Sequence, residues 1–269
     1  MALMLMTAAG LHAQMANNNE RTLSCEGSKG GGNRDNGRRQ ERACEVREYP
    51  IGSVSKLMVD GRDNGGVVVK GWDRSDVLVR AKVETWSRDA ADAKALASQV
   101  SVQSAGGNVR ADAPSFGDGR GWAVSYEVFV PHRTGLDLKA HNGGISIMDV
   151  SGEIAFDTKN GGVNLSRLAG NVHGKTTNGG LNVELAGSRW DGTQLDVSTT
   201  NGGIRMDVPA NYSARLETST VNGGLNVDFP VTVSGRLRLN KELAVNLGSG
   251  GPTVRVKTVN GGVSIRKKS

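Results

Sequence analysis

Acidic residues recur in the second half of this 269-residue chain at strand positions that should face outward. Among the side chains of the chain, these carboxylates are the best candidates for catalysis. Hydrolysis of a glycosidic bond needs two carboxylates about 5 to 10 Å apart. Asp207 and Asp228 hold equivalent positions of a sequence repeat and could face outward from neighbouring coils at that distance. Any regular repeat with a polar face produces such pairs, so the pattern alone does not indicate an enzyme. The outward acidic set comprises Asp157, Glu184, Asp196, Asp207, Glu217 and Asp228.

Patterns typical of other chemistries are absent from the sequence. A zinc site needs three or four converging ligands, and the four histidines are scattered without metal-binding spacing. Calcium-binding solenoids carry Asp at their turns, whereas the turns here do not. Neither a P-loop, nor a nucleophile elbow, nor a dinucleotide fingerprint occurs. We therefore predict a non-enzymatic protein with no cofactor and no metal.

Composition and charge narrow the class of partner. The net charge is +6, with aromatic residues at only 4%, and basic runs without interleaved aromatics do not indicate nucleic-acid binding. No window approaches the 18 or more apolar residues of a membrane-spanning helix. We expect no nucleic acid as partner and no transmembrane span in the mature chain.

The first 47 residues read as an export signal and a leader. Residues 1–13 are apolar and end in small residues, which resembles the back half of a secretory signal and predicts a periplasmic or cell-surface protein. Residues 14–47 lack apolar periodicity and read as a flexible leader. Cys25 and Cys44 lie within it. In an exported protein they could form a disulfide, and the sequence leaves open whether they do.

The remaining chain is organised by a repeated Asn-Gly-Gly tripeptide followed by an apolar residue. Successive copies are 18, 18, 23, 21 and 38 residues apart, and an outlying copy begins at Asn64. A motif at nearly fixed period is typical of a repeat architecture. The Asn residues of the six copies are Asn142, Asn160, Asn178, Asn201, Asn222 and Asn260.

Columns of like residues accompany this motif. The positions three and five after each Asn are apolar in all six copies, and threonine stands two before the Asn from the second copy on. Such ladders favour an all-β fold, a right-handed β-helix-like β-solenoid with coils of about 18–23 residues. Asn-Gly is also a hairpin signal, so an antiparallel β-sandwich is the alternative. We expect the corner residues to adopt left-handed backbone.

One segment interrupts the strand pattern. Residues 88–100 carry apolar residues at helical spacing behind a capping Ser87 or Asp89, which predicts a single helical insertion. We expect the domain to span residues 48–269. The last repeat should form the end of the stack, with its basic tail protecting the exposed edge.

The polar column one residue beyond the first apolar position predicts a binding strip. It forms a flat row of hydrogen-bonding side chains on a rigid sheet, suited to an extended polysaccharide or an envelope protein. The same row would also keep a solenoid soluble. Its members are Ser146, Asn164, Asn182, Arg205 and Asn226.

Several of these motifs resemble a known family. The repeated Asn-Gly-Gly units, the stretch from Asn64 to Asp73, the Ala-rich helix and the Tyr126–Pro131 strand together resemble the bacterial "putative adhesin" family, domain of unknown function 4097. The resemblance implies an exported or envelope-associated, β-solenoid-like domain from about Tyr49 onward. It supplies no catalytic residues.

Three functions remain open from the sequence. The first is a non-enzymatic, adhesin-like or envelope-interaction module of unknown ligand. The second is a component of an envelope stress or regulatory sensor that binds a membrane protein. The third is a polysaccharide-active enzyme built on a β-helix.

Overall fold

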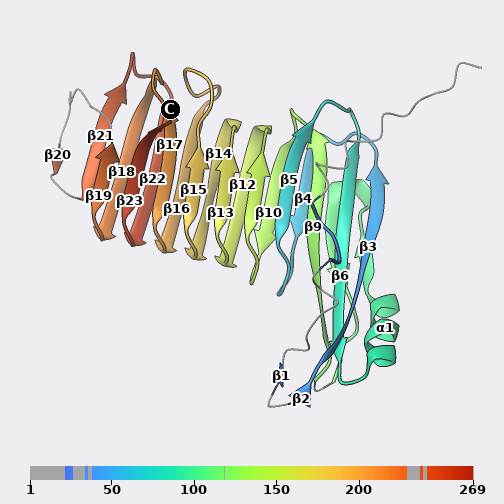
Figure 1. Cartoon of the computed structure of the whole chain (residues 1–269). Coiled ribbons are helices and arrows are strands. Elements are labelled where there is room, and N and C mark those ends of the chain that lie inside the picture. The colour runs from blue at the N-terminus through green and yellow to red at the C-terminus, as the bar shows by residue number, and fades with distance from the viewer. Residues whose placement is uncertain are drawn as a thin grey trace, which may run out of the picture.

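The computed structural model describes residues 22–26, 34–35, 38–117, 119–228, 237–238 and 241–268. Within them, two long sheets lie face to face, and their strands line up along one axis (Figure 1). The eleven-stranded sheet runs in the order β20 (Leu237–Arg238), β21 (Glu242–Leu247), β18 (Ala214–Asn222), β22 (Thr253–Asn260), β16 (Gln194–Asn201), β14 (Ala169–Asn178), β12 (Ser151–Asn160), β10 (Gly135–Ala140), β4 (Lys56–Asp60), β8 (Asn108–Asp112) and β7 (Ser101–Gln103).

The second sheet has ten strands and faces the first. Its order is β19 (Leu225–Asp228), β23 (Val263–Lys268), β17 (Ile204–Pro209), β15 (Leu181–Glu184), β13 (Val163–Ser166), β11 (Ile145–Met148), β5 (Val67–Trp72), β9 (Gly121–Pro131), β6 (Val77–Ser87) and β3 (Glu41–Ile51). A separate short pair consists of β1 (Arg34–Asp35) and β2 (Arg38–Arg39), and a 3₁₀ turn, η2, spans Ala105–Gly107.

Each repeat contributes one strand to each sheet, parallel to the same strand of its neighbours. Thus β12 pairs in parallel with β10 and β14, while β13 pairs in parallel with β11 and β15. The predicted β-solenoid is confirmed. The sandwich alternative is wrong for the repeats, because successive coils run in the same direction. Antiparallel pairing occurs in the terminal regions, among β3, β6 and β9, between β7 and β8, and among β18, β21 and β20.

The core lies between the two sheets and is built from the predicted apolar columns. Ile145, Ile147, Val163 and their equivalents in the other coils are buried, and they alternate with polar residues that face solvent. Leu225 and Val227 are the exceptions, being only half-buried, because β19 is the outermost strand of its sheet. The period-two pattern therefore specifies which face of each strand is buried, and the half-buried pair marks the end of the sheet.

The asparagines of the corners form a ladder along the stack. Asn160 donates through Nδ2 to Asn142 Oδ1 at 2.8 Å, and Asn178 donates in the same way to Asn160 at 2.7 Å. The ladder continues through Asn201, Asn260 and Asn222, and begins at Asn64. Side-chain amides donate and accept at once, so one residue type serves every rung.

The threonines that precede each asparagine form a second set of hydrogen bonds inside the corner. Each threonine is buried and donates its hydroxyl to the carbonyl of the first glycine in the adjacent coil, as Thr158 does to Gly143 and Thr176 to Gly161, both at 2.8 Å. Thr199, Thr258 and Thr220 repeat the bond. A buried carbonyl without a partner costs about 1–3 kcal/mol, so this column satisfies the corner that the glycines create.

The expectation of left-handed corners is wrong. Among the six repeated motifs only Gly261 has a positive φ, of 158°. The first glycine is required for a steric reason instead. A Cβ on Gly161 would lie 2.1 Å from the Gly143 carbonyl oxygen, whereas a Cβ on Gly162 would meet its nearest atom at 3.6 Å. The backbones of stacked corners approach so closely that no side chain fits between them.

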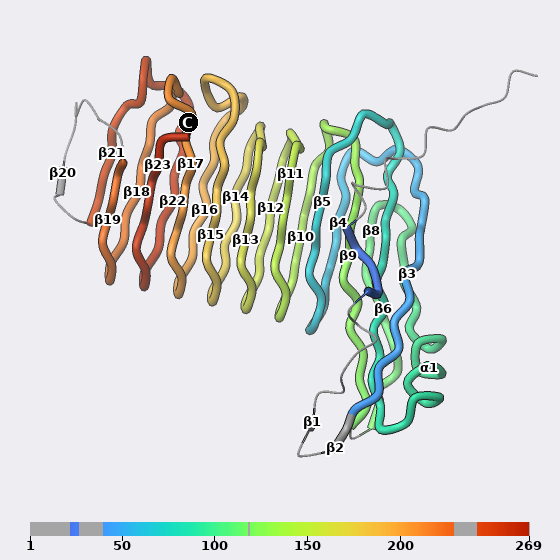
Figure 2. Tube along the Cα trace, viewed as in Figure 1, coloured from blue at the N-terminus to red at the C-terminus, as the bar shows by residue number. Residues whose placement is uncertain are grey.

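The final repeat does not end the stack. Strands β22 and β23 lie between β16–β17 and β18–β19, so the last coil in sequence is the penultimate coil in space (Figure 1, Figure 2). The expectation that its basic tail protects an exposed edge is therefore wrong. The chain passes outward through β18 and β19, returns along the antiparallel β21, and then inserts its last coil.

Part of the expected flexible leader is a strand. Residues 41–47 belong to β3, which pairs with β6 over its whole length, so a domain boundary at residue 48 falls inside an element. Residues 41–47 lack the apolar alternation of the other strands, and the side chains of β3 form polar contacts instead. Arg47 donates to the Ala97 carbonyl at 2.7 Å and to the Val100 carbonyl at 2.5 Å.

Those contacts cap the C-terminal end of the predicted helix, which is confirmed. Helix α1 spans Ala90–Gln99, and Asp89 caps its start by accepting from the Asp92 amide at 2.8 Å. It packs on β3 and β6 through Ala93 and Leu96 (Figure 1). Residues 1–13, the expected signal remnant, lie outside the described residues.

The corner geometry predicts different outcomes for two adjacent glycines. Gly161→Ala should destabilise the fold by roughly 2–4 kcal/mol, because its Cβ collides with the neighbouring backbone. Gly162→Ala should change stability by about 0.5 kcal/mol or less. Chemical denaturation followed by circular dichroism measures both, and equal losses in the two variants would contradict the steric account.

The insertion of the last coil can be tested by crosslinking. The paired cysteines of Asn201→Cys/Asn260→Cys should oxidise to a disulfide, because adjacent rungs lie about 4.8 Å apart, within disulfide range. Asn201→Cys/Asn222→Cys is the matched control and should stay reduced, because a coil lies between the two positions. Peptide mapping by mass spectrometry distinguishes them, and the opposite result would restore sequential stacking.

Candidate functional site

The predicted binding strip lies on the outer face of the ten-stranded sheet. Ser146, Asn164 and Asn182 hold the same register position on β11, β13 and β15. Asn182 Nδ2 donates to Asn164 Oδ1 at 2.8 Å, and Asn164 Nδ2 donates to Ser146 Oγ at 3.3 Å. These bonds fix the side chains in one row, with polar atoms at the spacing of the strands.

The row continues in a different order from the sequence. Arg205 follows Asn182 on β17, and Ser264 of the inserted coil lies between Arg205 and Asn226. Arg205 also contacts Asp207 on its own strand, with Nε 3.3 Å from Oδ1. In the structure the predicted strip residues therefore form one row, and Ser264 is part of it. By sequence order Ser264 would have followed Asn226 at the end of the row.

The structure separates the two outward carboxylates that the sequence singled out as a candidate acid pair. Asp207 and Asp228 hold the same column, yet Arg266 of the inserted coil separates them. The expectation that they face outward from neighbouring coils is wrong, because the inserted coil lies between theirs. In the same column, hydrogen bonds from Lys268 and Ser166 lower the pKa of Glu184. Acids held ionised by such partners are poorly suited to donate a proton.

The eleven-stranded sheet shows the same alternation of charge. Arg255 of the inserted coil donates to Asp196 at 2.7 Å on one side and to Glu217 at 2.9 Å on the other. Hydrogen bonding from Arg255 lowers the pKa of Glu217. Sequential stacking would have placed Asp196 beside Glu217, and like charges on adjacent strands are destabilising.

Metal and membrane features are missing from the described part of the chain. There, no three His, Cys, Asp or Glu side chains converge as metal ligands. His173 lies 3.6 Å from Glu153, and His132 hydrogen-bonds to the Asp149 carbonyl, both at the surface. The described residues include no helix that is long and apolar enough to span a membrane.

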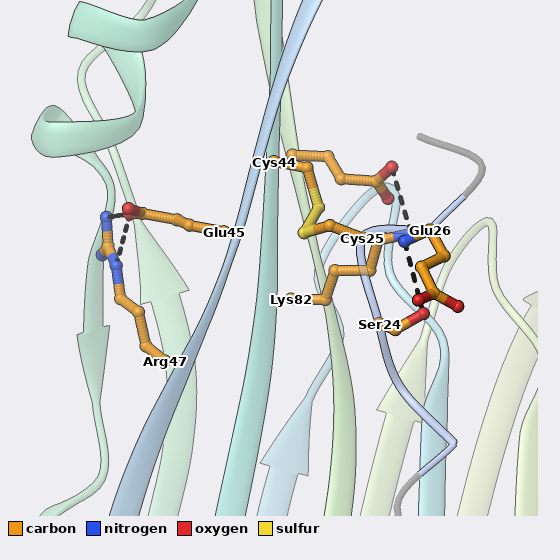
Figure 3. The surroundings of a disulfide bond; sticks show 8 residues. Ser24, Cys25, Glu26, Cys44, Glu45, Arg47 and Lys82 are labelled. Atoms are coloured by element: carbon orange, nitrogen blue, oxygen red, sulfur yellow. Dashed lines mark hydrogen bonds and ion pairs between the residues drawn. A yellow bond between two sulfur atoms is a disulfide. The ribbon is translucent and has the colours of Figure 1, made fainter. Parts of the chain in front are cut away.

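The N-terminal segment is attached to the outer face of the ten-stranded sheet at two points, of which the sequence indicated only the possible disulfide. Cys25 forms a disulfide with Cys44 on β3, with Cα atoms 5.8 Å apart (Figure 3). The second attachment is Glu127 on β9. It accepts from the Thr22 amide at 2.8 Å and from the Thr22 hydroxyl at 2.7 Å.

Glu127 is a buried carboxylate held by several donors. Burial alone would raise its pKa, but hydrogen bonds from Lys70, Thr22 and Arg80 outweigh burial and lower the pKa to about 2. Lys70 Nζ lies 2.8 Å from Oε1, and Arg80 contacts the other carboxylate oxygen. The cluster explains why a Glu is tolerated on a strand that is otherwise buried on both faces at this point.

Comparison with known proteins identifies the family. The model of Toastrack DUF4097 matches residues 64–266. The chain belongs to this Toastrack family. No functionally curated protein matches the chain.

Solved structures give more distant likenesses to this Toastrack chain. A "putative cell adhesion protein" from Clostridium sporogenes is 10% identical, with 85% of this chain and 100% of that chain covered and a TM-score of 0.43. A "putative adhesin" from Bacteroides fragilis and a "putative lipid binding protein" from Parabacteroides distasonis are 12% and 11% identical. Each aligns over 84% of this chain and 97% of its own, with a TM-score of 0.30. At these identities and TM-scores the likeness assigns no function to this chain.

The Glu127 cluster predicts a pH dependence of stability. The folded pKa of about 2 lies below the ordinary value of 4.5, so the stabilisation is present above pH 4.5 and is lost as the pH falls towards 2. Its size at neutral pH is roughly 3 kcal/mol. Glu127→Gln should remove this part of the acid dependence, whereas Glu153→Gln, at an exposed carboxylate, should retain it. Thermal unfolding between pH 2 and 7 measures the difference, and parallel curves for both variants would disprove the role.

Proposed function

We propose that this Toastrack protein is a non-enzymatic, exported, adhesin-like or envelope-interaction module. One observation supports the proposal most, namely the polar strip on the outer face of the ten-stranded sheet. Its side chains are fixed by hydrogen bonds to one another and repeat at the strand spacing of about 4.8 Å. An extended polysaccharide or protein segment can match such a row with little ordering of the receptor.

Export to the periplasm or cell surface is part of the proposal. The apolar first 13 residues support it, as does the disulfide between Cys25 and Cys44, because disulfides persist in oxidising compartments. The third function, a polysaccharide-active enzyme, loses support because Arg266 separates the acid pair on which it was based. The sensor that binds a membrane protein remains an outcome of the test below.

The strip is tested with the full chain and two matched variants. Asn182→Ala/Arg205→Ala removes two adjacent members of the strip, and Lys175→Ala/Ser198→Ala removes two adjacent outward residues of the other sheet. Surface changes of this kind alter stability by about 0.5 kcal/mol or less. A glycan array and a pull-down from envelope extract should show binding that weakens about tenfold or more in the first variant only.

Other outcomes would redirect the proposal. Equal binding by both variants would remove the strip from the interaction. Turnover of any bound glycan would establish the enzyme instead. Capture of a single membrane protein, with no glycan bound, would favour the sensor.

A further inference from the structure

An open cleft lies at the start of the solenoid, away from the polar strip. Its walls are the turn at residues 61–64, which leads into the first Asn-Gly-Gly, and residues 113–116 and 120 between β8 and β9. The cavity volume is about 440 Å³, which lies within the range of small-molecule sites. Here the first corner of the solenoid faces an irregular segment in place of another coil.

Aromatic side chains gather in this cleft. The whole chain has only four Trp, three Tyr and four Phe, yet Trp86, Trp122 and Phe116 all line it. None of the three is fully buried. Trp122 also packs against the core. Since most described aromatic residues elsewhere are buried in the core, partly exposed rings at one place indicate a surface for contact.

The Trp86 ring is held in position by a glycine. Gly121 pairs with Trp86 across β9 and β6, and a Cβ on Gly121 would lie 2.3 Å from the indole ring. The ring therefore rests on the Gly121 backbone and cannot collapse further into the sheet. The guanidinium carbon of Arg42 lies over the ring, 6.0 Å from its centroid, so a sugar that stacks on this ring must share its face with Arg42 or displace that side chain.

Polar groups around the rings are also pre-positioned. Arg62 pairs with Asp112 at 2.9 Å, and Arg120 pairs with Asp92 at 2.8 Å, so each guanidinium is anchored while some of its five N–H donors stay available. Asn64 is the first rung of the asparagine ladder. Its Oδ1 accepts from Asn142, and among the described residues its Nδ2 donates to no further rung.

These groups favour a carbohydrate over a peptide. A pyranose ring carries apolar C–H faces that stack on aromatic rings, and hydroxyls that bond to guanidinium, amide and carboxylate groups. A peptide would need a free strand edge, yet β5 pairs with β9 from Tyr126 onward, and Gly65 abuts the Val124 carbonyl, where a Cβ would lie 2.0 Å away. The edge left is too short for strand addition.

We propose that this cleft is a carbohydrate-binding site, in which Trp86 and Phe116 stack on sugar rings and Arg62 and Asn64 bond to hydroxyl or carboxylate groups. The proposal rests on the adhesin-like function but places the sugar at a site separate from the polar strip. Neutral and acidic sugars should bind alike, because three arginines, Arg42, Arg62 and Arg120, stand at or beside the rings and are balanced by Asp63 in the lining and by Asp112 and Asp92, which pair with two of them.

The test uses the full chain and tryptophan fluorescence, because two of the four tryptophans line the cleft. Tetragalacturonate, laminarihexaose and chitohexaose serve as acidic and neutral probes. We expect a change in emission on binding and a dissociation constant at least about tenfold weaker in Trp86→Ala. Phe116→Ala, on the segment between β8 and β9, should weaken binding as well, and it keeps the test valid if Trp86→Ala unfolds.

A matched arginine pair separates this cleft from the strip. Arg62→Gln removes a charge at the cleft, and Arg205→Gln removes one from the strip. Loss of sugar binding in Arg62→Gln alone supports the cleft. Loss in Arg205→Gln alone overturns the cleft but supports the proposed function, and binding of extended peptides without any sugar also overturns the cleft. Absence of all binding in the wild-type chain overturns both proposals.

Discussion

The fold depends on how closely its corners stack. At the first glycine of all six repeated corners, a Cβ would lie 2.0–2.2 Å from a carbonyl oxygen of the adjacent coil, which only glycine permits. This approach buries a carbonyl at every corner, and the threonine hydroxyl of the adjoining coil satisfies it. The asparagine ladder then links the exposed side of the same corners. Glycine thus permits the close approach, threonine satisfies the buried carbonyl, and asparagine links the exposed side. Because all three are needed at the same corner, they recur together.

The order of the coils depends on charge as well as shape. All coils share the same corner, so the corner alone would accept the last coil either at the end or between two others. Sequential stacking would place Asp207 beside Asp228 and Asp196 beside Glu217. Insertion of the last coil puts Arg266 between the first pair of acids and Arg255 between the second, where Arg255 bonds to both Asp196 and Glu217. We infer that these two arginines help to select the inserted arrangement.

Much of the fold was predictable because its causes are periodic. The apolar columns, the threonine column and the capped helix at Asp89 each depend on local spacing, and each appears where expected. The insertion of the last coil was missed because aligning equivalent repeat positions does not reveal the order in which the coils stack. The charges at residues 207, 228 and 266 could have indicated it, because a basic residue fits between two acidic ones. The structure of residues 41–47 was missed because β3 is stabilised by polar contacts, such as those of Arg47, that depend on residues about 50 positions away.

The difference between periodic and non-periodic parts of the chain also bears on where a ligand can bind. Along the regular coils Asn164 bonds to both Ser146 and Asn182, so this part of the strip offers a uniform surface for a repetitive partner. At the first corner the period fails, because Asn64 has no earlier rung and the segment between β8 and β9 replaces a coil. Aromatic rings that are not fully buried in the core are found there. Selective recognition therefore belongs to the place where the repeat begins, and the repeat itself supplies the rigid support.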